Sequence, residues 1–333
     1  MCKTEIKERK AYWGIAVGNN VVFLYPGQGS QQVGMGYDWY QTYPEVREIF
    51  EQADHLLDFS LSKLCFEGPK EELNQDLNAQ LAVYTVSCII TEVLRVKGVL
   101  PDVVSGYSSG FYAAAYAAGC FDFADGLCLV RQAGEILLDE GRKIDGSMAV
   151  IFGLSPEKVD DICQQAGDVQ IAILNTPRQT IISGIGPSVR RAMELSLKEG
   201  ALDAFTLSVG SAYHSRFMEQ SGIRFLREIK DINLRNPQIP LVSYLSLDCV
   251  PNKSELRNVM VTQLSHPVLW VDLIRRLCSN NIRLFIEVGP GEVISRTVRW
   301  IDRNIEIVNT ATKGRLLKTV ERYRPLRNSN RSK

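Results

Sequence analysis

Ser108 is the residue whose surroundings point most directly to chemistry. It lies in the segment 106–110 (GYSSG), between the apolar run 103–104 and the alanine-rich stretch 111–118. This order predicts a strand, a sharp turn and a helix, the setting in which a G-x-S-x-G segment exposes a serine nucleophile. The glycines leave room where strand and helix meet, and the helix N-terminus favours developing negative charge. The alternative is a plain turn that joins a strand to a helix.

A nucleophilic serine needs a base within hydrogen-bond reach. The chain has three histidines, at positions 55, 214 and 266. His55 falls within an amphipathic helical pattern, so we expect it at the surface. His266 precedes a proline, where a helix would start. By elimination His214 is the candidate base, and a hydrogen-bonded structural histidine is the alternative interpretation.

Acyl transfer also requires amide donors that face the developing oxyanion. The N–H of Ser109, at the start of the helix, is one candidate. The turn 27–29 (GQG) follows the apolar run 21–25 and presents free backbone amides. The loop could equally be a phosphate cradle or a plain turn. It lacks the Gly-Lys-Ser/Thr of a P-loop and the full spacing of G-x-G-x-x-G.

Composition narrows the class of protein. The 333 residues are 45% hydrophobic and 23% charged, with 38 basic and 38 acidic side chains. The zero net charge gives no field that would attract nucleic acid or an anionic membrane, so we predict neither partner. Eight scattered cysteines without a C-x-x-C pair indicate reduced thiols and a cytoplasmic protein. The charged N-terminus is no secretory signal, and apolar stretches such as 81–86 are too short to span a bilayer.

Alternating helical and strand patterns predict an α/β fold with a mostly parallel sheet. Helical spacing covers 44–57, 79–94 and 123–138, and apolar runs suggest strands at 21–25, 239–244 and 284–288. Between them, 147–208 reads as strand-helix-strand-strand-helix-strand, a split βαβ unit. We therefore expect an extension (1–20), a large subdomain (21–146 and 209–312), a small inserted subdomain (147–208) and a basic tail (313–333) that frays at its end.

Seven short segments, in order, resemble malonyl-CoA:acyl-carrier-protein transacylases and the acyltransferase domains of polyketide synthases. They are PGQGSQ (26–31), GYSSG (106–110), NTP (175–177), SG (183–184), YH (213–214), HPVLW (266–270) and EVGPG (287–291). The resemblance covers about residues 21–309. It implies an α/β-hydrolase-like large subdomain, a ferredoxin-like small subdomain and an active site in the groove between them.

The resemblance also implies roles. Ser108 would be the nucleophile, His214 the general base, and the amides of Gln28 and Ser109 the oxyanion hole. The backbone carbonyl of Leu269 would orient His214. An acyl group would pass from acyl-CoA to Ser108, then to the phosphopantetheine thiol of an acyl carrier protein, without metal or other cofactor. We expect a monomer. The substrate pocket would include Tyr107, Ala133, Asn175 and Tyr213.

The chain departs from the family at the pocket. Tyr107 stands where the family has histidine, and Phe111 where it has glutamate; Tyr107 can still pack and donate one hydrogen bond. Ala133 replaces the arginine that binds the malonyl carboxylate, and Arg131 would lie on the opposite face of its helix. Tyr213 is bulky, as in relatives that take acyl units without an α-branch. We therefore expect an uncharged acyl group other than malonyl.

Several alternatives remain open at this point. Malonyl could still be used if Arg178 or Arg216 supplied the clamp. The same residues could hydrolyse stalled acyl groups from a carrier protein, or the chain could be a non-catalytic scaffold. The basic residues of the tail could help to dock an acidic carrier protein, or could simply be solvated: Arg315, Lys318, Arg322, Arg324 and Arg327. The carrier would belong to fatty-acid synthesis or, as the departures favour, to a specialised polyketide-type pathway.

Overall fold

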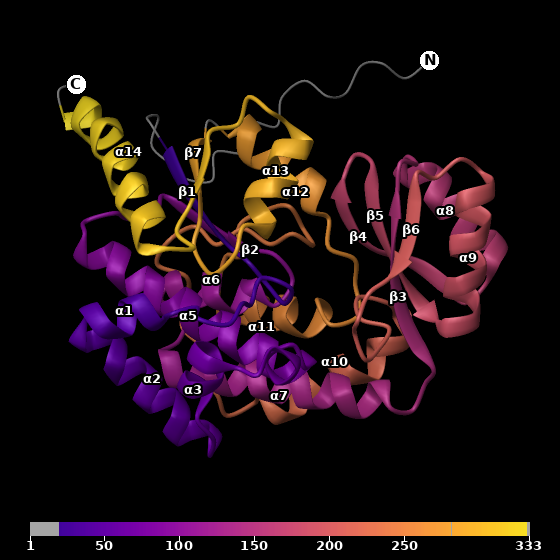
Figure 1. Ribbon diagram of the computed structural model, residues 1–333, viewed down its shortest axis with the longest axis horizontal. Coiled ribbons are helices and arrows are strands. Elements are labelled where there is room, and N and C mark those ends of the chain that lie inside the picture. The colour runs from indigo at the N-terminus through magenta and orange to yellow at the C-terminus, as the bar shows by residue number, and fades with distance from the viewer. Residues whose placement is uncertain (1–19, 281, 332–333) are drawn as a thin grey trace.

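The computed structural model describes residues 20–280 and 282–331. The expected N-terminal extension therefore lies, except for Asn20, outside the described residues. Within these described ranges the strands form two four-stranded sheets. Figure 1 shows the first among most of the helices and the second beside them, covered by two helices of its own.

The larger sheet is parallel and has the order β2-β1-β7-β8. Its strands are β1 (Asn20–Tyr25), β2 (Val103–Gly106), β7 (Ile282–Glu287) and β8 (Ile307–Asn309). Every residue of β1 is buried, as expected of an apolar run inside a sheet covered on both faces. Because parallel strands end at one edge, the loops after β1 and β2 meet there, and these loops hold Gln28 and Ser108.

Helices surround this sheet, with α5 (Asp76–Val96) the longest of those in the described chain. The others that pack around the sheet are α1 (Tyr37–Thr42), α2 (Pro44–Leu57), α3 (Leu61–Glu67), α4 (Lys70–Leu73), α6 (Gly110–Ala117), α7 (Phe123–Gly141), α10 (Glu219–Glu228), α11 (Lys253–Thr262), α12 (Trp270–Ser279), α13 (Val293–Ile301) and α14 (Lys313–Arg331). Helix α5 alone among the described helices is long and apolar enough to cross a membrane, but 83% of its apolar window is buried inside the protein. It is a core helix.

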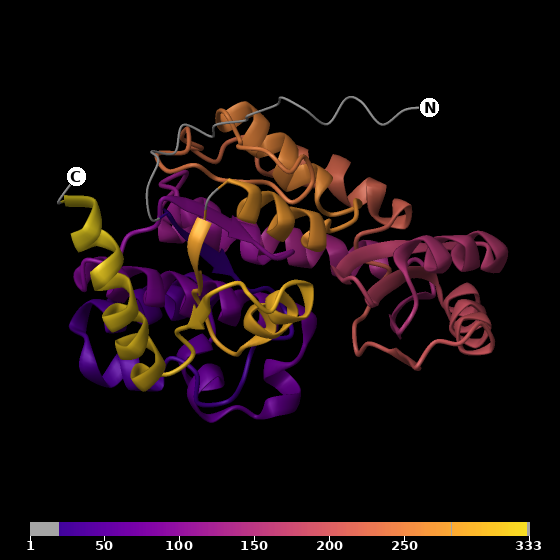
Figure 2. The same cartoon turned by 90° about the horizontal axis from the view of Figure 1, so that it is seen from above.

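The smaller sheet is antiparallel, with the order β4-β5-β3-β6. It consists of β3 (Gly146–Phe152), β4 (Val169–Thr176), β5 (Gln179–Ile185) and β6 (Asp203–Thr206), with α8 (Pro156–Ala166) and α9 (Gly186–Lys198) in the crossovers. This is the predicted split βαβ arrangement, and the predicted α/β fold class is confirmed. Seen from above, the unit forms a lobe at one end of the molecule (Figure 2).

Alternation along β3 gives the small sheet two different faces. Ala149 and Ile151 pack against the helices of the lobe in a small core of their own. Met148 and Val150 point to the opposite side and join the main hydrophobic core. The second face therefore turns towards the large sheet and becomes one wall of the site described below.

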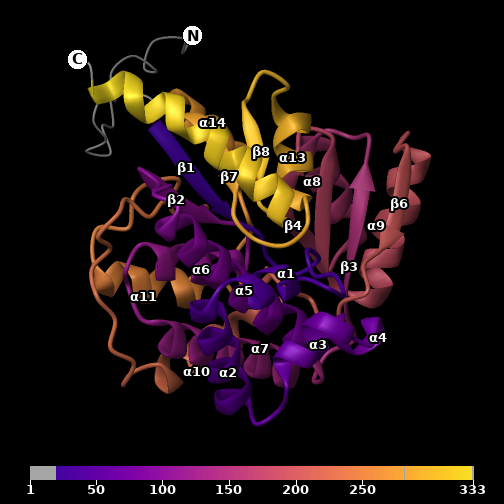
Figure 3. The ribbon, with the colours of Figure 1, turned by 60° about the vertical axis from the view of Figure 1, so that its left-hand side comes forward.

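One sequence-based expectation is wrong. The segment 239–244 does not form a strand: Leu241 makes a single parallel bridge to Val104, and Pro240 has no N–H to extend the ladder. The basic tail forms helix α14, which runs across the molecule beside β8 (Figure 3). The described residues end at Arg331, so the expectation that the end of the tail frays stays a prediction. Leu316 and Val320, which belong to this helix, are buried in the main core, and this burial holds the helix in place.

Candidate active site

Ser108 lies on a strained turn between β2 and α6. Its φ is 53°, a left-handed conformation that is uncommon for a residue other than glycine. A Cβ on Gly106 would lie 2.2 Å from the carbonyl carbon of Gly110, and one on Gly110 would lie 2.1 Å from the carbonyl oxygen of Tyr25. Both positions therefore require glycine, and the turn has the form expected of a nucleophile elbow.

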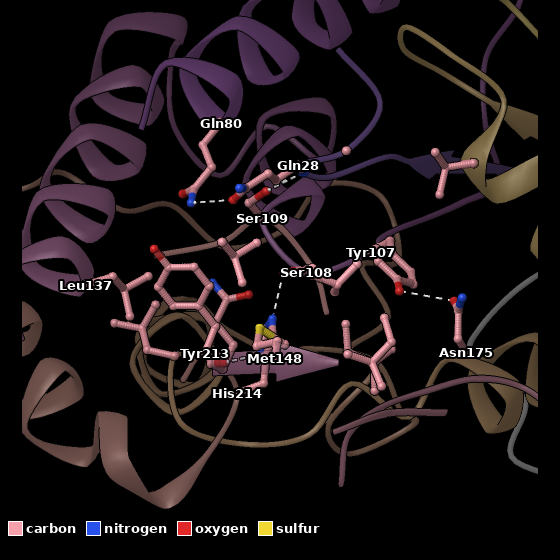
Figure 4. Close-up of a pocket in the computed structure, with 18 of the residues that line it drawn as sticks. Gln28, Gln80, Tyr107, Ser108, Ser109, Leu137, Met148, Asn175, Tyr213 and His214 are labelled. Carbon is pink, nitrogen blue, oxygen red and sulfur yellow. Dashed lines mark hydrogen bonds between the residues drawn. The ribbon is translucent and has the colours of Figure 1, made fainter. Parts of the chain in front are cut away.

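His214 reaches this turn from a distant part of the chain. Its Nε2 lies 2.7 Å from Ser108 Oγ (Figure 4). Its Nδ1 lies 2.9 Å from the carbonyl oxygen of Gln263 and 3.2 Å from that of His266. Carbonyls only accept hydrogen bonds, so Nδ1 carries the proton and Nε2 is free to accept one from Ser108.

The predicted orienting carbonyl, that of Leu269, is wrong. Leu269 is the N-cap of α12, and its carbonyl accepts the N–H of Leu273 inside that helix. Gln263 and His266 lie in the turn just before, which leaves their carbonyls available to the imidazole. The prediction located the right stretch of chain but not the right peptide groups.

The imidazole of His214 is held in its neutral form. Burial, which penalises the charged ring, lowers the pKa of His214 to about 4, against a smaller upward effect of the two carbonyls. A neutral imidazole with a free Nε2 can take a proton from a hydroxyl. The geometry and the protonation state together suit a general base.

The predicted oxyanion amides lie beside Ser108. Ser109 is the N-cap of α6, where the first N–H groups of a helix have no partner within it. The N–H of Gln28 donates to Ser109 Oγ over a long 3.3 Å. Gly27 permits this approach, since a Cβ there would lie 2.6 Å from the carbonyl oxygen of Tyr107.

The side chain of Gln28 is held by α5, a contact that sequence reasoning missed. Gln28 Nε2 donates to Asp76 Oδ1 at 2.5 Å, and Gln80 Nε2 donates to Gln28 Oε1 at 3.1 Å. Asp76 also accepts a hydrogen bond from Tyr213 Oη at 2.7 Å. Burial and the neighbouring Asp76 raise the pKa of Tyr213, so its hydroxyl remains a donor. The spacing of Asp76 and Gln80 on one helical face was the available signal.

A cavity of about 360 Å³ opens beside the serine-histidine pair. Its wall comprises Gln28, Gly29, Gln80, Tyr107, Ser108, Ser109, Tyr112, Ala133, Leu137, Met148, Val150, Ile173, Asn175, Gln179, Ile181, Phe205, Leu207, Val209, Tyr213, His214, Gln263, Leu264 and Val293. None of these described residues is a lysine, arginine, aspartate or glutamate. Figure 4 shows Leu137 and Met148 on one side of Ser108 and Asn175 on the other.

Tyr107 connects the two sheets at this cavity. Its hydroxyl donates to Asn175 Oδ1 at 3.0 Å, and Asn175 Nδ2 donates to Gln179 Oε1 at 2.6 Å. Its ring packs edge-on against the ring of Trp270, and the two ring centroids are 5.0 Å apart. The expectation that Tyr107 packs and donates one hydrogen bond is confirmed.

The arginines considered as carboxylate clamps lie elsewhere. Arg131 pairs with Glu135 on an exposed face of α7, whereas Ala133 is 1% exposed and lines the cavity. Arg178 donates to the carbonyl of Gly153, and Arg216 pairs with Asp168. The predicted opposite orientation of Arg131 is confirmed.

A metal site is a separate question. The described residues contain no group of three histidine, cysteine, aspartate or glutamate side chains arranged to hold a metal ion.

The fold and the site together are those of an α/β enzyme with a serine-histidine pair at the carboxyl edge of a parallel sheet. Residues 22–321 match the model of the acyl transferase domain family, and the chain belongs to that family of acyltransferases, within its malonyl-CoA:acyl-carrier-protein transacylase type.

Relatives with names and structures agree on this family. The malonyl CoA-acyl carrier protein transacylase of Bacillus subtilis is 34% identical over 87% of this chain and 93% of its own length. The solved structure of the malonyl CoA-acyl carrier protein transacylase from Coxiella burnetii has a TM-score of 0.88 and 32% identity, over 92% of this chain and 98% of that one. A malonyl transacylase in complex with a type II polyketide-synthase acyl carrier protein has a TM-score of 0.87 and 29% identity, over 91% and 99%.

Proposed function

We propose that this protein transfers an uncharged acyl group, other than malonyl, from coenzyme A to the phosphopantetheine of an acyl carrier protein. The observation that carries the proposal is the Ser108–His214 pair, whose Oγ and Nε2 atoms lie 2.7 Å apart at the edge of the cavity. The described wall of this cavity contains no lysine or arginine, so His214 is the one wall residue that could become a cation. Burial disfavours that charge. The relatives' names support the two substrates, CoA thioester and carrier protein.

The first half-reaction forms an acyl-serine. Ser108 Oγ gives its proton to His214 Nε2 and attacks the thioester carbonyl carbon. The backbone N–H groups of Gln28 and Ser109 stabilise the oxyanion. To do so, the N–H of Gln28 gives up its long hydrogen bond to Ser109 Oγ and donates to the oxyanion instead. The C–S bond then breaks, and the leaving sulfur takes the proton from His214. Free coenzyme A departs, and the acyl group stays on Ser108 as an ester.

The second half-reaction returns the serine. The phosphopantetheine thiol gives its proton to His214 Nε2, and its sulfur attacks the ester carbonyl. The same two amides hold the second oxyanion. The C–O bond to Ser108 breaks, and Oγ recovers the proton from His214. The products are an acylated carrier protein and the original enzyme, so protons and electrons balance without a cofactor.

Position 133 supports the choice of acyl group. Ala133 is buried in the cavity wall, and an apolar methyl there offers nothing to a carboxylate. A buried carboxylate without a partner is strongly disfavoured. Apolar side chains from α7 and β3 (Leu137, Met148 and Val150) suit a hydrocarbon chain instead.

The biological setting follows from the relatives and the surface. A carrier protein of polyketide type is supported by the complex described above. Two of the tail arginines are engaged in ion pairs, Arg315 with Glu292 and Arg322 with Glu306, which reduces the charge they offer for docking. The side chain of Arg327 lies outside the described part. We place the protein in the cytoplasm as a monomer.

The test is intact-mass analysis after incubation with equal concentrations of malonyl-, acetyl-, butyryl- and hexanoyl-CoA. We expect an acyl adduct on wild-type protein, with uncharged acyl groups in excess, and none on Ser108→Ala. The adduct should move to a holo-carrier protein and persist in buffer alone. A predominant malonyl adduct would contradict the specificity, and rapid loss in buffer would favour a hydrolase.

A further inference from the structure

Asp76 occupies an unusual position for a carboxylate. It is the first residue of α5 and only 9% of its surface is exposed. It accepts three hydrogen bonds, from Gln28 Nε2 at 2.5 Å, from the N–H of Gly210 at 2.8 Å and from Tyr213 Oη at 2.7 Å. None of the ion pairs between described side chains includes Asp76, so its charge has no cationic partner.

The three donors belong to two parts of the catalytic apparatus. Gln28 supplies one proposed oxyanion amide, and its side chain is fixed between Asp76 and Gln80. Tyr213 directly precedes the proposed base, His214. The oxyanion loop after β1 and the segment that carries the imidazole are therefore joined through one carboxylate. A change in either segment that broke these bonds would loosen its position relative to Ser108.

The same carboxylate contributes charge behind the cavity wall. Both Gln28 and Tyr213 line the cavity, so Asp76 lies one hydrogen bond behind two of its wall residues. Its three hydrogen-bond donors and the N-terminus of α5 hold the carboxylate in this position. No lysine or arginine stands between Asp76 and the cavity among the lining residues. An acyl group with its own carboxylate would meet a like charge there.

We propose that Asp76 is a specificity-determining and positioning residue: its charge selects uncharged acyl thioesters over carboxylate-bearing ones, and its hydrogen bonds hold Gln28 and the Tyr213–His214 segment in register. This inference rests on the proposed acyl transfer and adds a second cause of its specificity. Loss of the arginine at position 133 removes an attraction for malonyl, whereas Asp76 adds a repulsion.

Charge is tested with Asp76→Asn and Asp76→Ser, in which a neutral polar side chain replaces the carboxylate at the start of the helix. Asparagine keeps the size, and the amides of Gln28 and Gln80 can flip to match it. We expect the ratio of kcat/KM for malonyl-CoA to that for butyryl-CoA to rise about tenfold in both variants. An unchanged ratio in folded variants would overturn the charge role.

Positioning is tested with Tyr213→Phe, which removes one hydrogen bond and leaves the charge in place. We expect kcat with butyryl-CoA to fall about tenfold, with KM and the malonyl-to-butyryl ratio unchanged. The matched control is Tyr84→Phe, which removes another buried hydroxyl from the chain, one that donates to the carbonyl of Phe123 away from the cavity. Wild-type kcat in Tyr213→Phe, or an equal loss in Tyr84→Phe, would overturn the positioning role.

The other possible outcomes distinguish failure of the inference about Asp76 from failure of the proposed function. Unfolding of both neutral variants would overturn the inference, because Asp76 would then serve the fold and not selection. If wild-type protein forms no acyl-serine with any acyl-CoA, the proposed function fails. If it forms one and the variants select as wild type does, only the inference about Asp76 fails.

Discussion

Ser108 and His214 share a left-handed backbone conformation, with φ values of 53° and 57°, and their side chains meet at 2.7 Å. Such values are uncommon for residues with a Cβ and cost free energy in each case. Both residues sit on tight turns, one after β2 and one after the last strand of the small sheet. The strain fixes the directions of two side chains that must meet across the cavity.

The pH dependence of acylation follows from the state of His214. With its pKa lowered to about 4, the imidazole is already neutral at mildly acidic pH. We expect kcat/KM for acyl-serine formation to rise with pH around 4 and to be level by about pH 6. Rapid-quench measurements with butyryl-CoA would check this. A midpoint near 6.5, the value of an exposed histidine, would contradict the neutral buried base.

The free energy of unfolding should also depend on pH because of the lowered pKa of His214. The folded state holds His214 neutral where the unfolded chain would protonate it, so the unfolded state binds more protons between about pH 4 and about pH 6.5. The contribution of His214 is therefore complete above that window and declines as pH falls, by roughly 3 kcal/mol in all. Urea unfolding of wild type and His214→Asn should converge towards low pH. If the free energies of unfolding of the two proteins changed in parallel with pH, the neutral state of His214 in the folded protein would be contradicted.

Ala133→Arg should bring back preference for malonyl. The side chain enters an apolar cavity wall, where a bidentate pair with a carboxylate is strong. We expect the malonyl-to-butyryl ratio of kcat/KM to rise at least about tenfold. Arg131→Gln is the control, since Arg131 pairs with Glu135 on the exposed face of the same helix, and it should leave the ratio unchanged. Equal ratios in wild type and Ala133→Arg would exclude position 133 as the selector.

The sequence was sufficient to identify the residues whose signals are local. Ser108 stands out because a strand, two glycines and a helix surround it, and His214 because few histidines compete. The order of strands and helices in 147–208 was enough to give the antiparallel sheet. Each of these depends on short-range pattern, which a single sequence carries.

Contacts between distant segments could not be found in the same way. Leu269 was chosen in place of Gln263 and His266 because the peptide that faces His214 depends on where α12 begins. Asp76 was missed because the apolar pattern places the start of its helix at residue 79, and its partners are far away in the chain. The spacing of Asp76 and Gln80 was visible locally, but it does not tell which distant segments the carboxylate joins.

Gly110→Ala tests the packing of the serine turn. The new Cβ would lie 2.1 Å from the carbonyl oxygen of Tyr25, with Pro26 backbone atoms also within 3 Å. Because all of these are backbone atoms, the clash could be relieved only by moving β1 or the start of α6. We expect a loss of about 3 kcal/mol or more in the free energy of unfolding, and no acyl-serine. Gly314→Ala in α14 is the control, because nothing lies within 4 Å of its Cβ and alanine favours a helix. If the urea midpoints of Gly110→Ala and Gly314→Ala shifted by the same amount, the steric argument would be refuted.

Glu287 offers a test away from the serine. It is fully buried at the end of β7, and its two oxygens accept the N–H groups of Ile294 and Ser295 at 2.9 and 2.8 Å. Burial raises the pKa of Glu287 to about 7, despite the opposing hydrogen bonds. The folded state therefore binds more protons than the unfolded chain above pH 4.5, and this stabilisation is lost as pH rises through about 7.

Glu287→Gln keeps one acceptor and turns an amide N–H₂ towards the second backbone N–H. We expect it to destabilise the protein by about 1–3 kcal/mol at pH 5 and by clearly less at pH 8, because only the wild type must bury a charge at the higher pH. Urea unfolding at both pH values measures this, with the exposed Glu48→Gln of α2 as control. A difference that stayed constant with pH would mean that Glu287 does not titrate in the folded protein in this range.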